Sequence, residues 1–103
     1  MPRKDQILAL LADNPSDAFL RFALAKEYEK EGADAGAREI YEALVAEQPD
    51  YVGTYYHLGK TLERLGDRAG AYRTYTDGMA VTKRLGERHA MRELAGARLE
   101  IEE

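Results

Sequence analysis

A gapless internal repeat is the feature that most constrains the fold of this 103-residue chain. Residues of the first half recur with the same identity 34 positions later, and no insertion interrupts the match. The identical pairs are Leu24/Leu58, Lys26/Lys60, Gly32/Gly66, Gly36/Gly70, Ala37/Ala71, Tyr41/Tyr75 and Ala46/Ala80. A fixed period of this length is typical of stacked helix-turn-helix units, each of which buries its apolar face against its neighbours.

The first helix of the earlier repeat is predicted to run to about Lys30. Ser16 or Asp17 can cap it, because their side-chain oxygens accept from the free amides of a first turn. The apolar stripe with helical period is Leu20, Leu24, Ala25 and Tyr28. Gly32 then ends the helix, because glycine tolerates the positive φ that follows a helix terminus.

The second helix of this repeat is predicted to begin at Asp34, as its cap, and to end at Gln48-Pro49-Asp50. Its inward face would be Ala37, Ile40, Tyr41, Leu44 and Val45. The later repeat follows the same plan, with a turn at Gly66 and an end at Gly86. Small residues at equivalent positions (Ala25/Gly59 and Ala37/Ala71) leave room for two helices to cross closely, with Tyr41 and Tyr75 beside the crossing.

Both flanks of the repeats also read as helices. Within residues 3–12, the apolar side chains of Ile7, Leu8, Leu10 and Leu11 recur at helical spacing. The repeat register also extends to this segment, because Ile7, Leu10, Leu11 and Pro15 lie 34 positions before Tyr41, Leu44, Val45 and Pro49. The N-terminal helix therefore matches the second half of a preceding unit. A final helix is predicted from about Arg88, with Met91, Leu94, Ala95 and Leu99 on its apolar side, and its pattern departs from the repeat. Gly78 predicts a close approach of this final helix.

These recurring residues resemble the tetratricopeptide repeat: small-Leu-(Gly/Ala)-x-x-(Tyr/Leu), a Gly before the second helix, then Ala and a Tyr four residues on. Two positions depart from the family pattern. Arg21 and Tyr55 stand where tryptophan is frequent, and Lys83 stands where proline closes a unit. The resemblance implies an all-α right-handed superhelix of antiparallel hairpins. We expect one domain over 1–103, composed of a half repeat (1–14), two repeats (18–51 and 52–85) and a capping helix (87–103).

Catalytic and metal-binding residues are not evident. The chain has no Cys, and its one serine, Ser16, is explained by capping. Neither His57 nor His89 belongs to a set of three or four metal ligands. Each glycine falls at a helix end or a helix crossing, so no phosphate-binding loop is predicted. We therefore expect a protein that is not an enzyme and that needs no cofactor or metal; a small enzyme or metal protein is the least favoured alternative.

Charge and hydropathy restrict the partners further. The net charge is -4, with six basic and eleven acidic residues in 1–51 and nine and eight in 52–103. A phosphate backbone requires a basic field, so nucleic acid is not an expected partner. The apolar run from Ile7 to Ala12 is too short for a secretory or membrane-spanning segment. We expect no membrane association and a cytoplasmic location.

The resemblance implies that the first helices of the repeats line a concave groove. The residues predicted to face it are Phe22, Lys26, Glu29 and Lys30 of one repeat and Tyr56, His57, Lys60, Glu63 and Arg64 of the next. Aromatic area beside cations favours binding of a protein or peptide, and the cations would select an acidic one. Lys26, Lys60 and Arg64 resemble part of the family's clamp for a C-terminal carboxylate, without its Asn. The alternative is that these charges form solvated pairs within each helix.

A second reading is structural. Leu8 occupies the position held by Glu42 and Thr76 in the later units, where a side chain should face solvent. Ile7, Leu8 and Leu11 could then form a bare apolar patch, and we expect it to support a weak homodimer. Two alternatives remain at this point: Phe19 and Phe22 cover the patch, or a preceding helix of a longer array does.

Overall fold

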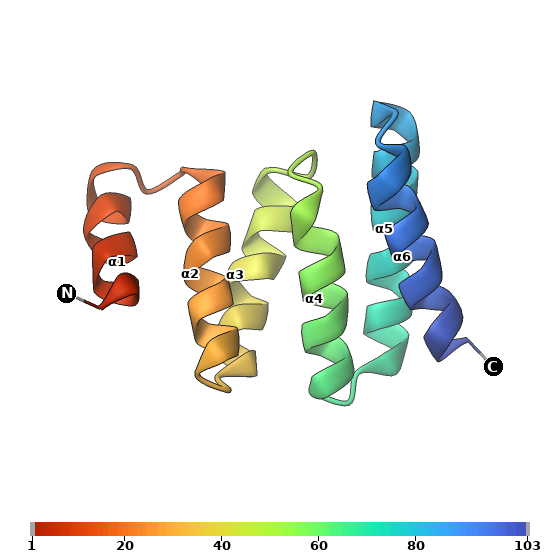
Figure 1. Ribbon diagram of the computed structural model, residues 1–103, viewed down its shortest axis with the longest axis horizontal. Coiled ribbons are helices and arrows are strands. Elements are labelled where there is room, and N and C mark those ends of the chain that lie inside the picture. Colours follow the sequence, from red (N-terminus) through yellow and green to blue (C-terminus); the bar gives the residue numbers. More distant parts are fainter. Residues whose placement is uncertain (1, 103) are drawn as a thin grey trace.

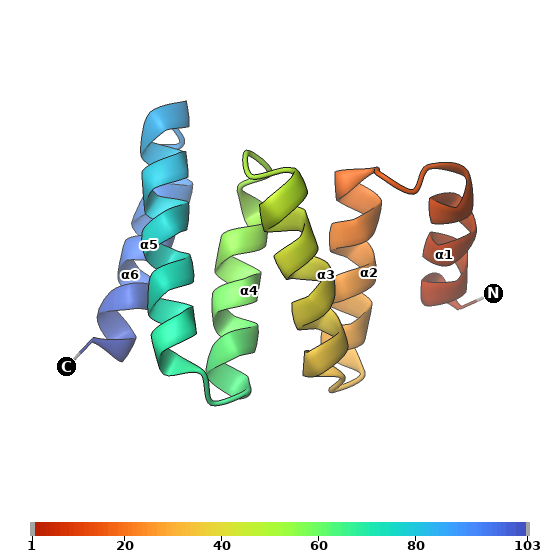
Figure 2. The same cartoon turned by 180° about the vertical axis from the view of Figure 1, so that it is seen from behind.

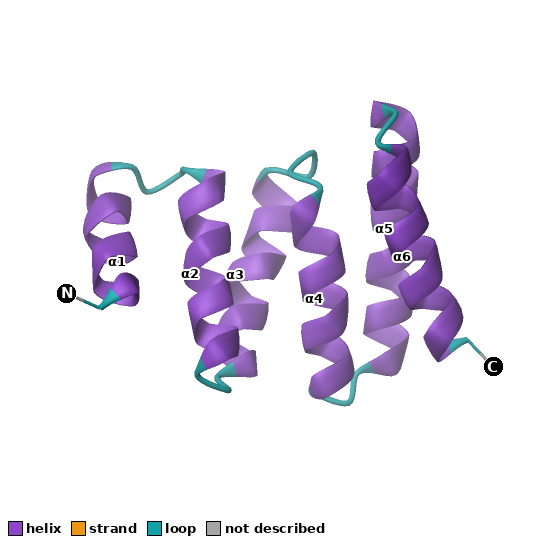
Figure 3. Cartoon of the chain, in the orientation of Figure 1, coloured by secondary structure: helices purple, strands orange, loops and turns teal. Residues whose placement is uncertain are grey.

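The computed structural model describes residues 2–102, which form six α-helices joined by short loops (Figure 3). They are α1 (Arg3–Asp13), α2 (Ala18–Lys30), α3 (Asp34–Glu47), α4 (Gly53–Arg64), α5 (Arg68–Leu85) and α6 (Arg88–Ile101). Residues 2–102 contain no β-strand. The predicted all-α repeat fold is therefore confirmed.

Successive helices pack on one another in an elongated stack of 43 × 29 × 20 Å, with the two termini at opposite ends (Figure 1). Contacts join α1 to α2, α2 to α3, α3 to α4, α4 to α5 and α5 to α6, and α6 also touches α4. Seen from one side, α2, α4 and α6 lie in front, and from behind α3 and α5 lie in front (Figure 2). The first helices of the repeats thus share one face of the stack.

Three glycines end helices as predicted. Gly32, Gly66 and Gly86 have φ of 75°, 84° and 75°, values that a side chain makes unfavourable. In each case the residue after the glycine donates its amide to a carbonyl five residues back, as in Ala33 to Tyr28, Asp67 to Leu62 and Glu87 to Thr82. These bonds satisfy helix-terminal carbonyls, so the turn and the helix end are fixed together.

The caps follow the prediction at one position and depart from it at another. The Asp17 carboxylate accepts from the amide of Leu20 at 2.9 Å and so caps α2. The prediction that Asp34 caps α3 is wrong, because α3 begins at Asp34 itself and its side chain accepts no amide there. That carboxylate is free to bind across the stack, and it contacts the guanidinium of Arg64 at 3.0 Å.

Close helix crossings account for the small residues. Ala25, Ala37 and Ala71 have no exposed surface. A methyl group on Gly59 would lie 2.0 Å from the ring of Tyr75, so only glycine leaves room for that ring. Gly78 is also closely approached, with a methyl there 2.6 Å from Tyr55 and 2.9 Å from Leu94. The predicted approach of the final helix at Gly78 is present, and α4 adds a second one.

The tyrosines beside the crossings carry buried hydroxyl groups that need hydrogen-bond partners. Tyr41 and Tyr75 have no exposed surface. Their hydroxyls donate to Glu29 and Glu63, the carboxylates at the ends of the preceding helices. Burial and the neighbouring carboxylates raise the pKa of both tyrosines, so both remain donors. Each hairpin is therefore closed by the same bond, over the same twelve-residue spacing.

Glu29 joins three helices. It lies on α2, accepts from Tyr41 of α3, and contacts two side chains of α4: Arg64 at 2.9 Å and His57 at 3.6 Å. Burial alone would raise the pKa of Glu29, but the neighbouring His57 and the hydrogen bonds from Tyr41 and Arg64 outweigh it and lower the pKa to about 2. The carboxylate is therefore charged at neutral pH and holds the two repeats against each other.

The departure of α6 from the repeat has a simple structural origin. α5 ends at Leu85, four residues beyond the position equivalent to Glu47, the end of α3. Lys83 stands in place of the proline that would have stopped it. The turn that follows is shorter, which offsets most of this extension. The buried position of Leu58 on α4 is taken by Leu94 on α6, 36 rather than 34 residues later. α6 thus lies where a third first helix would, displaced by two residues.

We expect Ala71→Leu to destabilise the fold by about 1–3 kcal/mol, because the crossing of α4 and α5 has no space for the added carbons. Ala37→Leu should do the same at the crossing of α2 and α3. Urea unfolding followed by circular dichroism measures the change. Ala35→Leu is the matched control, since Ala35 is an exposed residue of α3. Equal stability of the two crossing variants and the parent would contradict the packing described.

Acid should weaken the fold through Glu29. Its folded-state pKa lies below its ordinary value, so its stabilisation is complete above pH 4.5 and is lost as the pH falls towards 2. We therefore expect Glu29→Gln to be less stable than the parent at pH 6 and the difference to shrink at pH 3. The exposed Glu42→Gln serves as the control. A difference that does not change with pH would show that Glu29 is not held in this network.

Candidate functional site

The predicted groove residues lie on two first helices, and five of the nine line two different hollows. Phe22, Lys26 and Lys30 of α2 line a hollow between α1 and α2. Tyr56 and Lys60 of α4 line a different hollow, between α4 and α6. His57 and Arg64 lie between these places and contact Glu29. The structure therefore divides the predicted groove into two hollows separated by a bonded centre.

An aromatic cluster forms this centre. The Phe22 ring lies 5.2 Å from His57, 5.7 Å from Tyr51 and 5.9 Å from Tyr41, measured between ring centroids. Tyr56 continues the cluster, 5.6 Å from His57. Such tilted and edge-on pairs fix the rings relative to one another. The face between α2 and α4 therefore offers rigid aromatic area.

Most cations of the predicted groove are already bound to carboxylates of the same chain. Lys60 contacts Glu63 at 3.7 Å and Glu100 at 3.8 Å. Lys30 contacts Glu27 at 3.3 Å. Two of these pairs, Lys30–Glu27 and Lys60–Glu63, are three residues apart on one helix, as the alternative of charge pairs within each helix predicts. The Lys60–Glu100 contact instead joins two helices.

Arg64 has a different role from the one expected of a groove residue. Its guanidinium contacts Glu29 and Asp34 of the preceding repeat, at 2.9 and 3.0 Å. The hydrogen bond to Asp34 is the main reason that the pKa of Arg64 is raised. Arg64 therefore bridges the repeats, and removing it would also disturb the fold.

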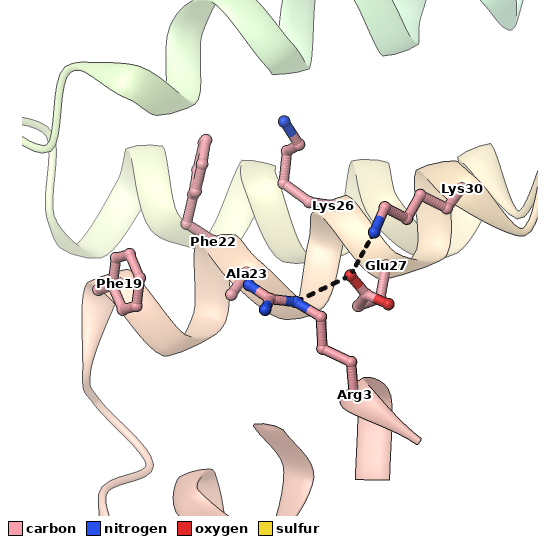
Figure 4. A pocket seen from close by; sticks show the side chains of 7 residues that line it. All are labelled: Arg3, Phe19, Phe22, Ala23, Lys26, Glu27 and Lys30. Atoms are coloured by element: carbon pink, nitrogen blue, oxygen red, sulfur yellow. Dashed lines mark ion pairs between the residues drawn. The ribbon is translucent and has the colours of Figure 1, made fainter. Parts of the chain in front are cut away.

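Lys26 differs from these cations. It makes no ion pair with any residue in 2–102, and its Nζ lies 6.0 Å from the centroid of the Phe22 ring. Phe22 and Lys26 project from α2 in the same direction, whereas Glu27 lies between Arg3 and Lys30 (Figure 4). Lys26 is thus the cation of the predicted set whose charge remains available to a ligand.

The hollow around Lys26 has a volume of about 320 Å³, and we call it the N-terminal hollow. It is lined by Arg3, Phe19, Phe22, Ala23, Lys26, Glu27 and Lys30 (Figure 4). Phe19 is 62% exposed there. Three cations face one carboxylate, so the lining carries a formal charge of +2.

The hollow between α4 and α6, the C-terminal hollow, has about half that volume, about 160 Å³. Its lining is Tyr56, Lys60, Arg92, Glu93, Gly96, Ala97 and Glu100. Two cations face two carboxylates, so its formal charge is zero. Although Phe22/Tyr56 and Lys26/Lys60 are equivalent positions of the repeat, the two hollows differ in size and in charge.

The residues predicted to form an apolar self-association patch are separated in the structure. Ile7 is 5% exposed because it packs on Ala23 and Leu24 of α2, so the expectation that it lies bare needs correction. Leu8 is 43% exposed. Leu11 is half-buried and lines a hollow between α1, α2 and α3 with Pro15, Leu24, Ile40 and Ala43 among its neighbours.

Several residues of the site were not predicted from the sequence. Arg3 and Phe19 line the N-terminal hollow, and Tyr51 belongs to the aromatic cluster. Glu29 and Glu63 were expected to face the groove or, in the alternative, to form solvated pairs within their helices, yet both accept from buried tyrosines. The signal for the last two was available, because Glu and Tyr recur together at the period of 34 residues.

Two further features bear on the kind of site. Among residues 2–102, no three His, Asp or Glu side chains converge as ligands of a metal ion would. Within the same residues, every helix is too short or too polar to cross a bilayer.

Comparisons with known proteins place the chain in a family. No protein-family model matches it. A curated TPR repeat-containing protein of Pseudomonas aeruginosa is 33% identical over 85 residues, which is 82% of this chain and 81% of that protein. This identity and coverage indicate common descent.

Solved structures agree with this relationship. A tetratricopeptide repeat domain protein from Salinibacter ruber, determined by NMR in solution, is 44% identical, with a TM-score of 0.82 over 85% of this chain and 89% of that one. A crystal structure of a Salinibacter ruber domain of the same kind is 43% identical, with a TM-score of 0.79 over 84% and 96%. A Bordetella parapertussis protein is 29% identical, with a TM-score of 0.84 over 98% and 88%. The chain therefore belongs to the tetratricopeptide-repeat family.

Proposed function

We propose that the chain is a non-enzymatic scaffold that binds a peptide or an extended protein segment across the face formed by α2 and α4. Tetratricopeptide-repeat proteins are generally non-catalytic scaffolds, and their fold generally mediates protein–protein interaction. The observation that carries the proposal is the aromatic cluster of Phe22, His57 and Tyr56, which is fixed on this face and flanked by two hollows.

The aromatic cluster suits a peptide because its rings are already immobilised. Binding then costs little side-chain entropy, and a rigid aromatic surface supplies large contact area. Phe22, Tyr56 and His57 would make these contacts. Among the cations, Lys26 would meet the charge of the partner. Lys30 and Lys60, each paired with a carboxylate of the chain, would border the contact, and Arg64 would hold the two repeats in register beneath it. An acidic segment is the partner that this set favours.

A second candidate function is weak self-association through α1. Leu8 is 43% exposed on this helix, at the position that Glu42 and Thr76 hold in the later units, and an exposed leucine where the repeat has a polar residue favours a contact surface. In this proposal Leu8 contributes the contact, Leu11 borders it, and Ile7 supports it from the core. The partner would be a second copy of the chain.

The peptide-binding face can be tested with a random dodecapeptide display library selected on the full chain. A selected peptide should shift the amide resonances of α2 and α4 in a ¹⁵N-labelled sample and leave α3 and α5 largely unchanged. Tyr56→Ala should weaken binding about tenfold in calorimetry, because a central aromatic contact is lost. The matched control is Tyr72→Ala, an exposed tyrosine of α5. Failure to select any peptide, or shifts confined to α3 and α5, would refute the proposal.

Self-association predicts a concentration-dependent mass in sedimentation velocity. Leu8→Glu should restore a monomer at every concentration, since it places a charge in the apolar contact. Gln6→Glu, a change of an exposed residue on the same helix, should have no such effect. A parent protein that stays monomeric at high concentration would exclude this second function.

A further inference from the structure

We infer that the N-terminal hollow binds a large apolar side chain of the partner together with a neighbouring Asp or Glu, and so sets the sequence preference of the scaffold. This inference rests on the proposed function, because it requires a peptide on the face of α2 and α4. It adds the chemistry of the bound segment and the place where that chemistry is recognised.

Size favours the N-terminal hollow as the anchoring place. Its volume of about 320 Å³ lies at the lower end of the range typical of ligand pockets, whereas the C-terminal hollow, about 160 Å³, lies below it. A hollow of the larger size accommodates a leucine or phenylalanine side chain with its flanking backbone. The C-terminal hollow has no equivalent space for an anchor.

The walls of the N-terminal hollow suit an apolar group. Phe22 and Ala23 form its inner side, and both are packed against the core of the stack. Phe19 stands at its edge with 62% of its surface exposed. Covering a large apolar side chain contributes about 1.5–3 kcal/mol, and an exposed phenylalanine next to a hollow is available for that gain.

Charge then selects an acidic neighbour for this anchor. Glu27 contacts Arg3 and Lys30, each at 3.3 Å, so one carboxylate serves two cations. Lys26 has no carboxylate partner among residues 2–102. The surplus of two positive charges therefore lies beside the apolar walls, within reach of a carboxylate adjacent to a bound apolar side chain.

The equivalent lysine of the second repeat shows why this preference should be confined to one end. Lys60 meets Glu63 on its own helix and Glu100 on α6. α6 brings that second carboxylate to α4, whereas no helix within residues 2–102 brings one to Lys26. Repeat symmetry alone would place an acid-binding lysine in both units, but only the N-terminal one retains its charge for a partner.

Calorimetry with one peptide from the display library and its amide variant tests this inference. The probe is a selected peptide that contains Asp or Glu beside a large apolar residue, and in the variant Asn or Gln replaces the acid. We expect the parent protein to prefer the acid form about tenfold. Lys26→Gln should remove that preference, and an unchanged circular dichroism spectrum and urea midpoint of the variant would exclude misfolding as the reason. The matched variant Lys60→Gln should retain the preference.

Phe19→Ala provides an independent readout of the apolar part. It should weaken both forms of the peptide about equally, since it removes contact area and no charge. Equal effects of Lys26→Gln and Lys60→Gln, or no difference between acid and amide peptides, would overturn the inference while the binding face stands. Selected peptides without acid-apolar pairs would also overturn it. If no peptide binds α2 and α4 at all, the proposed function fails as well.

Discussion

A buried tyrosine hydroxyl that must find a carboxylate is the constraint on which the two hairpins depend. The rings of Tyr41 and Tyr75 fill the space left by Ala25 and Gly59 at the helix crossings. Their hydroxyls cannot reach water, so a glutamate from the end of the preceding helix turns inward to accept from each. Packing and hydrogen bonding are therefore satisfied by one contact, which also fixes the angle at which each hairpin closes.

This contact has an effect beyond its own hairpin. Once Glu29 is drawn inward by Tyr41, its charge needs compensation, and Arg64 of the next repeat supplies it, with His57 also in contact. A cation that would otherwise face a ligand is thus used to join the repeats. The second repeat has an analogous centre at Glu63, where Lys60 takes part. Because most cations on this face are paired within the chain, the positive charge that remains for a partner lies around Lys26.

The sequence predicted those features that depend on neighbours along the chain. Gly32, Gly66 and Gly86 end helices because their conformation is local, and the buried faces of Ala37 and Tyr41 follow from helical period. Features that depend on how two helices are rotated against each other were not predicted. Asp34 was expected to act locally as a cap, yet its partner Arg64 lies 30 residues away. Likewise Ile7 is buried by Ala23 and Leu24, a contact that periodicity cannot reveal. The hollows belong to the same class, because each is formed between helices.

The extra turn of α5 changes the way this array could be lengthened. A shift of two residues rotates a helix by about 200° about its axis, so a side chain at a given repeat position on α6 faces nearly the opposite way. Arg92 occupies the position of Leu24 and Leu58 by the 34-residue count, yet it is exposed, and Leu94 is buried instead. A further repeat joined in the original register would therefore present its polar side to the core. A further repeat whose register is shifted by the same two residues, and which follows the longer α5, would keep its apolar side inward.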